Sequence, residues 1–438
     1  MGVRPSFQAK SAEGRCHNMS DAAETATASV AGERARTKDS VMAASLISAH
    51  GFEHMYGRGF LVVIPKIVDE LALVNYQAGL MDAARSVSSG LTSMGSGFFA
   101  DMFQHRRAQI LALSMAMIGI GYFLVAVSPT YVLILMALLL PSAGSALWHP
   151  PAIGLLSQRF PKRRGLLISL HRSTGNLGDT IGSLLVGSLL IVLGWRWIMG
   201  GGTPMLILLA LVILLLLRSL GGSKPRDVAF GKNLKAQLHS LRDAFKGRGM
   251  GAILPIFVVS AVHGMGDRAF IWMIPLYLSK ELGKSDFTVG VHVALLAAPG
   301  IIAGPLFGHL SDRIGRKSII AFIMALASVL PVTMVLGGGG IGTTLSVAAF
   351  GLFAFSVNSL TQAAAIDVVE GKQLEGTFIG LMWGSNAFFG AATAVGAGLL
   401  ADVAGRQAAF YLASSLFFLG FLASLVMPAI KPYRVQPA

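Results

Sequence analysis

The feature that most constrains this chain is a series of apolar runs long enough to cross a lipid bilayer. One of them, IMGGGTPMLILLALVILLLL at 198–217, contains no charged residue. A helix of about 20 apolar residues spans the hydrocarbon core of a membrane. The whole chain is 54% hydrophobic and 13% charged, with a mean hydropathy of +0.66, whereas soluble domains carry about 25% charged residues. The sequence therefore predicts a multi-pass membrane protein.

The apolar runs predict an all-α membrane protein with twelve transmembrane helices. Their expected ranges are 41–65, 76–100, 108–127, 131–158, 165–193, 198–217, 250–279, 288–311, 318–336, 343–367, 376–401 and 406–429. The single cysteine, Cys16, excludes a disulfide within the chain and a cysteine-based metal site.

The distribution of basic residues predicts the orientation of these helices. The net charge is +14, with 35 Lys and Arg residues. Most of them fall in the N-terminal leader, in the loops after even-numbered helices and in the C-terminal tail, which the positive-inside rule places in the cytoplasm. Few lie on the opposite side: Lys66, Arg196, Lys280, Lys284 and Arg406. We therefore expect an inner (cytoplasmic) membrane protein with both termini in the cytoplasm, and no binding of nucleic acid.

Two halves of the chain resemble each other. RGFLVVIP at 58–65 matches RAFIWMIP at 268–275, and GFFADMFQHRR at 97–107 matches GHLSDRIGRK at 308–317. Matches at a nearly constant separation indicate an internal duplication. Parallel six-helix repeats are typical of secondary transporters, which hold their substrate between the repeats.

A long polar stretch between the repeats sets the expected domain boundaries. We expect a disordered cytoplasmic N-terminal tail, two six-helix bundles joined by a cytoplasmic linker, and a short cytoplasmic C-terminal tail. In chain order these regions are 1–40, 41–217, 218–249, 250–430 and 431–438.

The segment GHLSDRIGRKS at 308–318 resembles the cytoplasmic loop signature of the major facilitator superfamily. The resemblance implies a monomeric transporter of two pseudo-symmetric six-helix bundles, with a conformational latch that holds the outward-open state. Glycine allows close helix packing, an Asp complements a neighbouring helix N-terminus, and Arg and Lys bind carboxylates or anionic lipid headgroups. The predicted latch residues are Gly308, Asp312, Arg313, Gly315, Arg316 and Lys317, with Gly97, Asp101 and Arg106 in the degraded first-half copy.

Within that superfamily, the chain most resembles the fosmidomycin-resistance family. The resemblance rests on a polar first helix, on SAGSALWHPPA at 142–152 and on RGLLISLHRSTGNLGDTIGSLL at 164–185. It implies proton-coupled export of a small, anionic compound or drug by antiport. The chain lacks the family's Gly-Pro step in helix five, where it has Gly182–Ser183, and the helix-four arginine of many drug–proton antiporters. Proton-coupled uptake of an anionic metabolite therefore stays open as an alternative, as does a non-transporting sensor with the same fold.

The first helix carries four titratable side chains on one face. His50, Glu53, His54 and Arg58 are spaced by three and four residues, which brings them together on a helix. An ionisable group that faces lipid costs on the order of several kcal/mol. This face is therefore expected to line a water-filled cavity that other polar helices share.

Chemistry assigns roles to these groups. Arginine offers a bidentate fork for phosphonate, phosphate or carboxylate, while histidines and carboxylates carry protons. The predicted substrate-binding residues are Arg58, His54, Arg172, Asn176, Arg268, Asn358 and Gln362. The predicted proton-coupling residues are His50, Glu53, Asp179, His263 and Asp267. Asp82 and Arg85 are expected to pair with each other, and His149 stays open between a cavity role and a structural one.

The absent motifs limit the chemistry. The chain contains no GxxxxGK[ST], HExxH or GxSxG, so it is not predicted to use ATP or to be an enzyme. We expect no metal site and no cofactor. The expected partners are a small-molecule substrate, protons and the anionic headgroups of membrane lipids.

Overall fold

The computed structural model describes residues 10–102, 104–218, 248–369 and 375–429, and within these ranges it contains helices and no strand. The helices of the first half are α1 Lys10–Glu70, α2 Asn75–Met102, α3 Arg107–Val127, α4 Tyr131–Arg159, α5 Arg164–Leu189, α6 Trp195–Gly201 and α7 Thr203–Leu217. Those of the second half are α9 Arg248–Ile271, α10 Met273–Leu276, α11 Asp286–Leu295, α12 Gly300–Ile314, α13 Arg316–Leu336, α14 Ile341–Val369, α15 Glu375–Ala404 and α16 Gln407–Val426. Short 3-10 turns lie at Gln104–Arg106 and Pro161–Arg163, and a π turn at Tyr277–Glu281.

Each expected transmembrane segment coincides with one of these helices or with consecutive ones, which confirms the all-α membrane fold. The sixth segment is divided between α6 and α7, the seventh between α9, α10 and the π turn, and the eighth between α11 and α12. The last of these divisions precedes Pro299, whose ring removes a backbone donor and disfavours helical geometry in the preceding residue.

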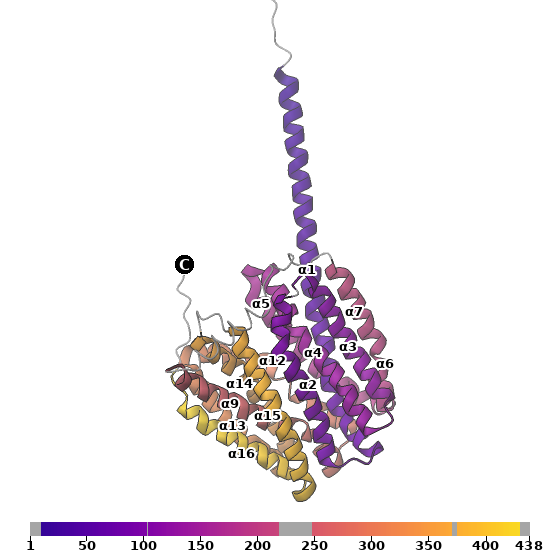
Figure 1. Cartoon of the computed structure of the whole chain (residues 1–438), viewed down its shortest axis with the longest axis vertical. Coiled ribbons are helices and arrows are strands. Elements are labelled where there is room, and N and C mark those ends of the chain that lie inside the picture. The colour runs from indigo at the N-terminus through magenta and orange to yellow at the C-terminus, as the bar shows by residue number, and fades with distance from the viewer. Residues whose placement is uncertain (1–9, 103, 219–247, 370–374, 430–438) are drawn as a thin grey trace, which may run out of the picture.

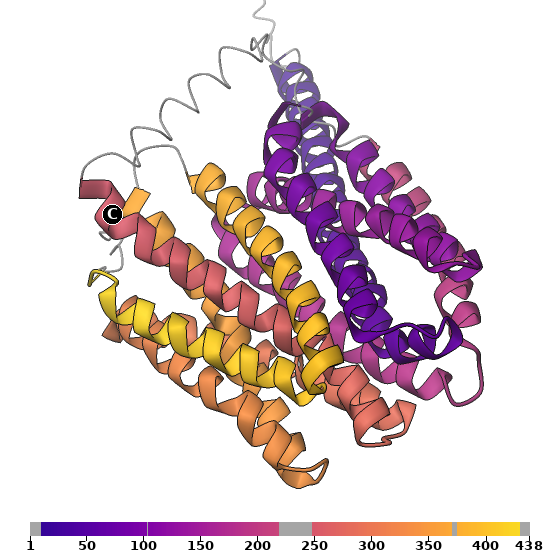
Figure 2. The same ribbon diagram turned by 60° about the horizontal axis from the view of Figure 1, so that its bottom comes forward.

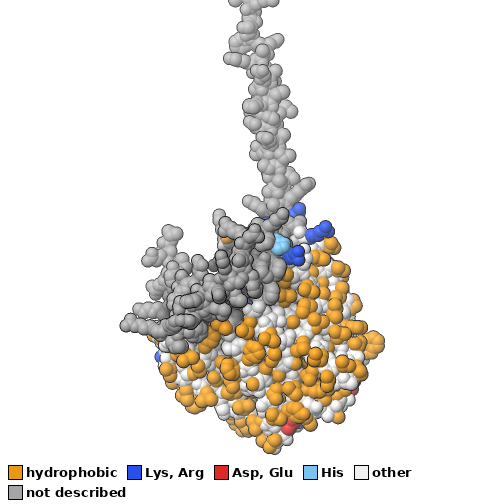
Figure 3. All heavy atoms as spheres, viewed as in Figure 1, with side chains coloured by type: hydrophobic (Ala, Val, Ile, Leu, Met, Phe, Trp, Pro, Cys, Tyr) orange, Lys and Arg blue, Asp and Glu red, His pale blue; other side chains and the backbone are white. Residues whose placement is uncertain are grey.

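The outer surface is predominantly apolar. Among the residues that the structure describes, nine helical segments are long and apolar enough to span a membrane. The long helices α1, α2 and α5 are outside that set, because they carry most of the polar side chains singled out above. Large apolar side chains such as Ile302, Leu215 and Val403 remain exposed, and hydrophobic side chains dominate the face seen in Figure 3. Such a surface fits lipid rather than water.

The two halves of the chain lie side by side (Figure 2). The main contacts between them pair α2 with α15 and α5 with α11. In the repeat, α2 corresponds to the eighth helix and α15 to the fifth, so the two interfaces are equivalent. The polar helices α1, α2 and α5 therefore flank the boundary between the halves.

Helices α1 and α5 pack unusually closely, and two glycines allow it. A Cβ atom placed on Gly178 would lie 2.0 Å from the carbonyl oxygen of Gly51, and one on Gly182 would lie 2.3 Å from that of Met55. Only glycine permits backbones this near to each other. This contact fixes the polar face of α1 against α5.

The halves are joined by polar contacts at the end where α1 finishes and α2 begins. We call this set the outer contacts: Lys66–Asp286 at 2.9 Å, the ion pair of Asp69 with Lys280, and Asn75–Asp402 at 2.7 Å. Arg406 adds a hydrogen bond to the side chain of Asn75 at 2.9 Å. These contacts close the boundary at the end opposite to the start of α1.

The N-terminal region differs from the expectation. Residues 1–40 were expected to be disordered, but α1 continues back to Lys10 and stands away from the bundle (Figure 1). Its sequence, DAAETATASVAGERAR at 21–36, is rich in alanine and charged residues, which have a high intrinsic helix propensity. Residues 1–9, nearly all of the linker at 218–249 and the tail at 431–438 lie outside the described residues.

Candidate functional site

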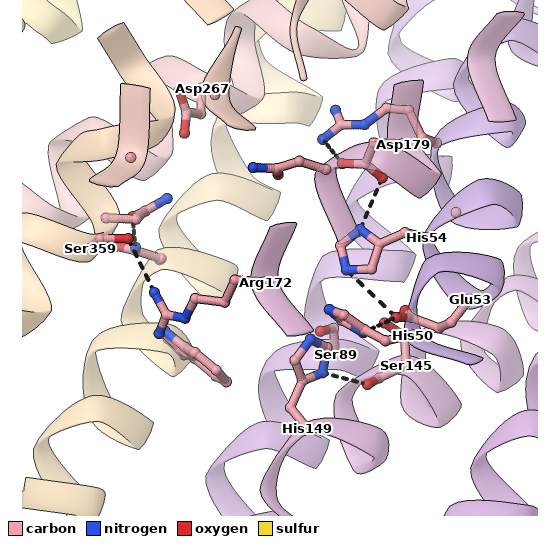
Figure 4. Close-up of a pocket in the computed structure, with 18 of the residues that line it drawn as sticks. His50, Glu53, His54, Ser89, Ser145, His149, Arg172, Asp179, Asp267 and Ser359 are labelled. Carbon is pink, nitrogen blue, oxygen red and sulfur yellow. Dashed lines mark hydrogen bonds and ion pairs between the residues drawn. The ribbon is translucent and has the colours of Figure 1, made fainter. Parts of the chain in front are cut away.

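The site forms where the polar face of α1 meets α5. Arg58 donates to Asp179 Oδ2 at 2.9 Å, and His54 Nδ1 lies 2.9 Å from Asp179 Oδ1. Asp179 is almost fully buried. The carboxylate therefore holds two predicted substrate-binding side chains at the cavity wall, and Figure 4 shows its contact with His54.

Four histidines gather beside this network. The rings of His50 and His171 stack with centroids 3.8 Å apart, and His54 and His149 lie 4.5 and 5.0 Å from His50. His149, which the sequence left open, thus belongs to the site. Its Nδ1 donates to the backbone carbonyl of Ser145 at 2.9 Å, so it also satisfies a carbonyl in the proline-containing helix α4.

Glu53 lies at the centre of these histidines. Its Oε1 accepts a short hydrogen bond from the hydroxyl of Ser145. Its Oε2 is 3.2 Å from His50 Nδ1 and 3.6 Å from His54 Nε2. The carboxylate is therefore buried among imidazoles rather than turned to lipid.

The second half contributes a different set of charges. His263 Nδ1 lies 3.5 Å from Asp267 Oδ2 on the same helix, α9. Arg268 reaches across the boundary and donates to Asp82 of α2 at 3.1 Å. The expected partner of Asp82, Arg85, is 3.9 Å away and instead donates to the carbonyl of Gly57 at 3.1 Å. Asp82 is thus shared, and its shorter contact links the two halves.

Arg172 of α5 also reaches the second half, where it donates to Ser359 of α14 at 3.2 Å. Among the residues that the structure describes, no carboxylate forms an ion pair with Arg172. Its side chain is exposed in the cavity. A guanidinium without a carboxylate partner is available to an anionic ligand.

One cavity of about 860 Å³ connects these groups, within the range of small-molecule sites. It is lined by eleven of the twelve predicted substrate-binding and proton-coupling residues: His50, Glu53, His54, Arg58, Arg172, Asn176, Asp179, Asp267, Arg268, Asn358 and Gln362. His263 lies behind the wall and is completely buried. The lining extends to Gly165 near the start of α5 and to Pro305 in the first half of α12, away from the outer contacts.

The lining also contains residues that sequence reasoning missed, among them Ser145, Ser359, Trp383 and Asn386. Asn386 receives a hydrogen bond from Ser260 and donates to Asn358, at 3.2 and 3.4 Å. Serine and asparagine are common in packed membrane helices, so their spacing alone gave no signal.

The second-half loop signature has an internal ion-pair network. Arg316 contacts Asp312 at 2.9 Å and Asp367 of α14 at 2.6 Å. Gly315 has φ +98°, which a residue with a side chain rarely adopts, so the glycine allows the turn between α12 and α13. Arg313 is exposed.

The first-half copy is arranged differently from the expected match. Arg107, rather than the predicted Arg106, begins α3 as Arg316 begins α13, and it donates to Gln158 at 2.6 Å as Arg316 donates to Asp367. Arg106 is exposed. The surroundings of Gly97 and Asp101 lie outside what the structure describes. The first-half loop is longer between its glycine and the arginine that begins the next helix, so aligning the two loops by sequence pointed to Arg106 instead of Arg107.

Comparisons with known proteins agree with this architecture. The profile of the Major Facilitator Superfamily matches residues 46–382 and 256–438. The chain is 24% identical to the fosmidomycin resistance protein of Escherichia coli (strain K12), over 89% of this chain and 93% of that protein. It is also 24% identical to the MFS-type transporter YfnC of Bacillus subtilis (strain 168), over 86% and 91%.

The fold has solved counterparts. A bacterial homologue of the human lysosomal transporter Spinster, in an inward-facing and occupied conformation, superposes with a TM-score of 0.70 at 15% identity, covering 91% of this chain and 99% of that one. Its inward-facing, unoccupied form gives a TM-score of 0.66 at 16% identity, covering 92% and 99%. With the profile match spanning the bundles, the chain belongs to the Major Facilitator Superfamily and is a multi-pass membrane transporter of that family.

Proposed function

We propose that this transporter exports a small anionic compound in exchange for protons, by rocking its two halves around the central cavity. The observation that carries the proposal is Arg172, a cationic side chain that lies in the cavity at the boundary between the halves and has no carboxylate partner among the described residues. The relative named for fosmidomycin resistance supports the direction of export.

Substrate contact is assigned to groups from both halves. Arg172 and Asn176 of α5 face Asn358 and Gln362 of α14 across one cavity. An anion held between the guanidinium and these amides would bind both halves at once. Binding of this kind supports alternating access, because a substrate favours conformations in which both sets of contacts can form.

Proton coupling is assigned to His263 and Asp267 of α9. Asp267 lines the cavity with Oδ1 lacking a hydrogen bond, while His263 lies behind it. Asp267 lies beside the imidazole of His263 and near the guanidinium groups of Arg268 and, from the first half, Arg58. Movement of the halves would change the distance to Arg58 and with it the affinity of Asp267 for a proton. His50, Glu53 and Asp179 stay predictions for this role.

The test uses proteoliposomes with an imposed pH gradient, an internal proton-sensitive dye and a panel of phosphonates and carboxylates. A transported compound should move protons in the opposite direction. Asp267→Asn should retain compound exchange and lose its coupling to protons. Proton movement in the same direction as the compound would replace export with the symport alternative.

Arg172→Gln tests substrate contact in the same assay. A hydrogen bond to a charged group contributes about 1.5–3 kcal/mol, so the apparent affinity should fall roughly tenfold to hundredfold. Arg163→Gln is the matched control, since Arg163 is exposed outside the cavity lining. Equal apparent affinities in the Arg172→Gln and Arg163→Gln variants would show that Arg172 does not contact the substrate.

A further inference from the structure

Four side chains of the first half form a cluster with the composition of a metal site. The donor atoms of His50, Glu53 and His54 from α1 and His149 from α4 all lie within 4.8 Å of one another. We propose that this histidine cluster binds one divalent transition-metal ion of the zinc class at the wall of the central cavity. Binding of the ion does not depend on the transport function proposed above.

Two of the imidazoles are already oriented as metal ligands. His149 Nδ1 is 2.9 Å from the backbone carbonyl of Ser145, and a carbonyl can only accept, so Nδ1 carries the hydrogen. His54 Nδ1 is likewise 2.9 Å from the Asp179 carboxylate. In the neutral rings, Nε2 then keeps its lone pair. In known metal sites, the ring nitrogen that does not bind the metal donates its hydrogen to a carbonyl or carboxylate, and this hydrogen bond fixes the orientation of the histidine.

Glu53 supplies the anionic ligand. Ser145 holds Oε1, while Oε2 points to the histidines and makes no hydrogen bond. His50 Nδ1, only 3.2 Å from that oxygen, also lacks one. Both residues are less than 5% exposed. A divalent ion held between these two atoms would coordinate both and compensate the buried negative charge.

The donor set selects the class of ion. Imidazole nitrogens with one carboxylate suit zinc and its neighbours, whereas magnesium and calcium prefer oxygen ligands throughout. Donors about 2.1 Å from a tetrahedral ion are about 3.4 Å apart. Side-chain rotations that move each donor atom by about 1 Å would therefore bring the four donors to the distances of a bound ion. Because His54 and His149 line the cavity, the ion has a path of entry.

No metal site was expected from the sequence, because the chain has a single cysteine and no HExxH motif. The overlooked signal is H-x-x-E-H at 50–54, which places two histidines one helical turn apart. The remaining ligand, His149, is distant in sequence and joins them through the packing of α4 beside α1. A pattern within α1 alone therefore supplied only part of the site.

The experiment measures binding to full-length protein that carries no histidine tag, purified in detergent and stripped of metal. Zn²⁺ is titrated by calorimetry, and Co²⁺ reports coordination through its visible absorption. We expect one ion per chain and a tetrahedral cobalt spectrum. His149→Gln should weaken binding at least tenfold, and His50→Gln, from the other side of the cluster, should do the same.

His292→Gln is the matched control. His292 is buried like His50, and it bonds Thr288 and Thr344 outside the cluster. Circular dichroism and gel filtration establish that each variant is folded. The proposal would be overturned if the wild type bound no Zn²⁺, or if all three folded variants bound it with equal affinity. Transport by such a protein would leave the proposed function standing, so the two can fail separately.

Discussion

Asp179 shows how a single buried carboxylate organises the site at the scale of residues. It accepts from Arg58 through one oxygen and from His54 through the other. The side chains of Arg58 and Asp179 are 13% and 6% exposed. Removing one member of a buried ion pair leaves an uncompensated charge, which costs more than the loss of an exposed pair.

Asp179→Asn should therefore destabilise the protein strongly, by on the order of 3–5 kcal/mol. The melting temperature of metal-free protein in detergent measures it. Asp286→Asn is the control, because it breaks the more exposed pair with Lys66 and should cost no more than about 1 kcal/mol. Similar melting temperatures for the two variants would contradict the structural role of Asp179.

The sequence predicted which side chains occupy the cavity better than it predicted their partners. Spacing by three and four residues placed His50, Glu53 and Arg58 on one face of α1, and that face does line the cavity. Spacing within α2 also suggested that Asp82 pairs with Arg85, yet the shorter contact comes from Arg268 in the other half. Contacts between distant helices depend on packing that no local pattern contains.

At the scale of elements, hydrophobic length predicted the helices closely. The run expected at 108–127 is α3 at Arg107–Val127, because apolar composition and membrane thickness limit both ends. The interruption between α11 and α12 was not predicted. Pro299 allows a break there, but Pro331 lies inside the continuous helix α13. The presence of a proline alone therefore does not predict whether a helix is interrupted.

The contact between α1 and α5 gives a prediction at this scale. Gly178→Ala should separate the two helices and destabilise the protein by about 1–3 kcal/mol, because the new Cβ would lie 2.0 Å from the carbonyl oxygen of Gly51. Gly165→Ala on the same helix is the matched control, since a Cβ there has no atom within 4 Å.

Melting temperatures of the two variants in detergent, together with the wild type, test this contact. Gly178→Ala should melt well below the wild type, whereas Gly165→Ala should melt close to it, since its free energy of unfolding should change by only about 0.5 kcal/mol. A Gly178→Ala protein as stable as the control would mean that α1 and α5 do not approach as described.

At the scale of the whole molecule, the polar contacts define which end is closed. The outer contacts join the halves where α1 ends, whereas the ion pairs of Arg316 stay within the second half. The loop signature was predicted as a latch, but the outer contacts were not predicted, because their partners lie on helices far apart in the sequence.

Lys66→Gln combined with Lys280→Gln should therefore shift the population away from the conformation described here. Each exposed ion pair contributes about 0.2–1 kcal/mol, so losing two should change the ratio of conformations roughly twofold to thirtyfold. Spin labels on the two halves at the outer end measure it, as a larger fraction of long distances. Glu70→Gln is the control, because Glu70 pairs with Arg196 inside the first half, at 2.7 Å. An unchanged distance distribution in the double variant, or the same shift in Glu70→Gln, would show that the outer contacts do not hold the halves together.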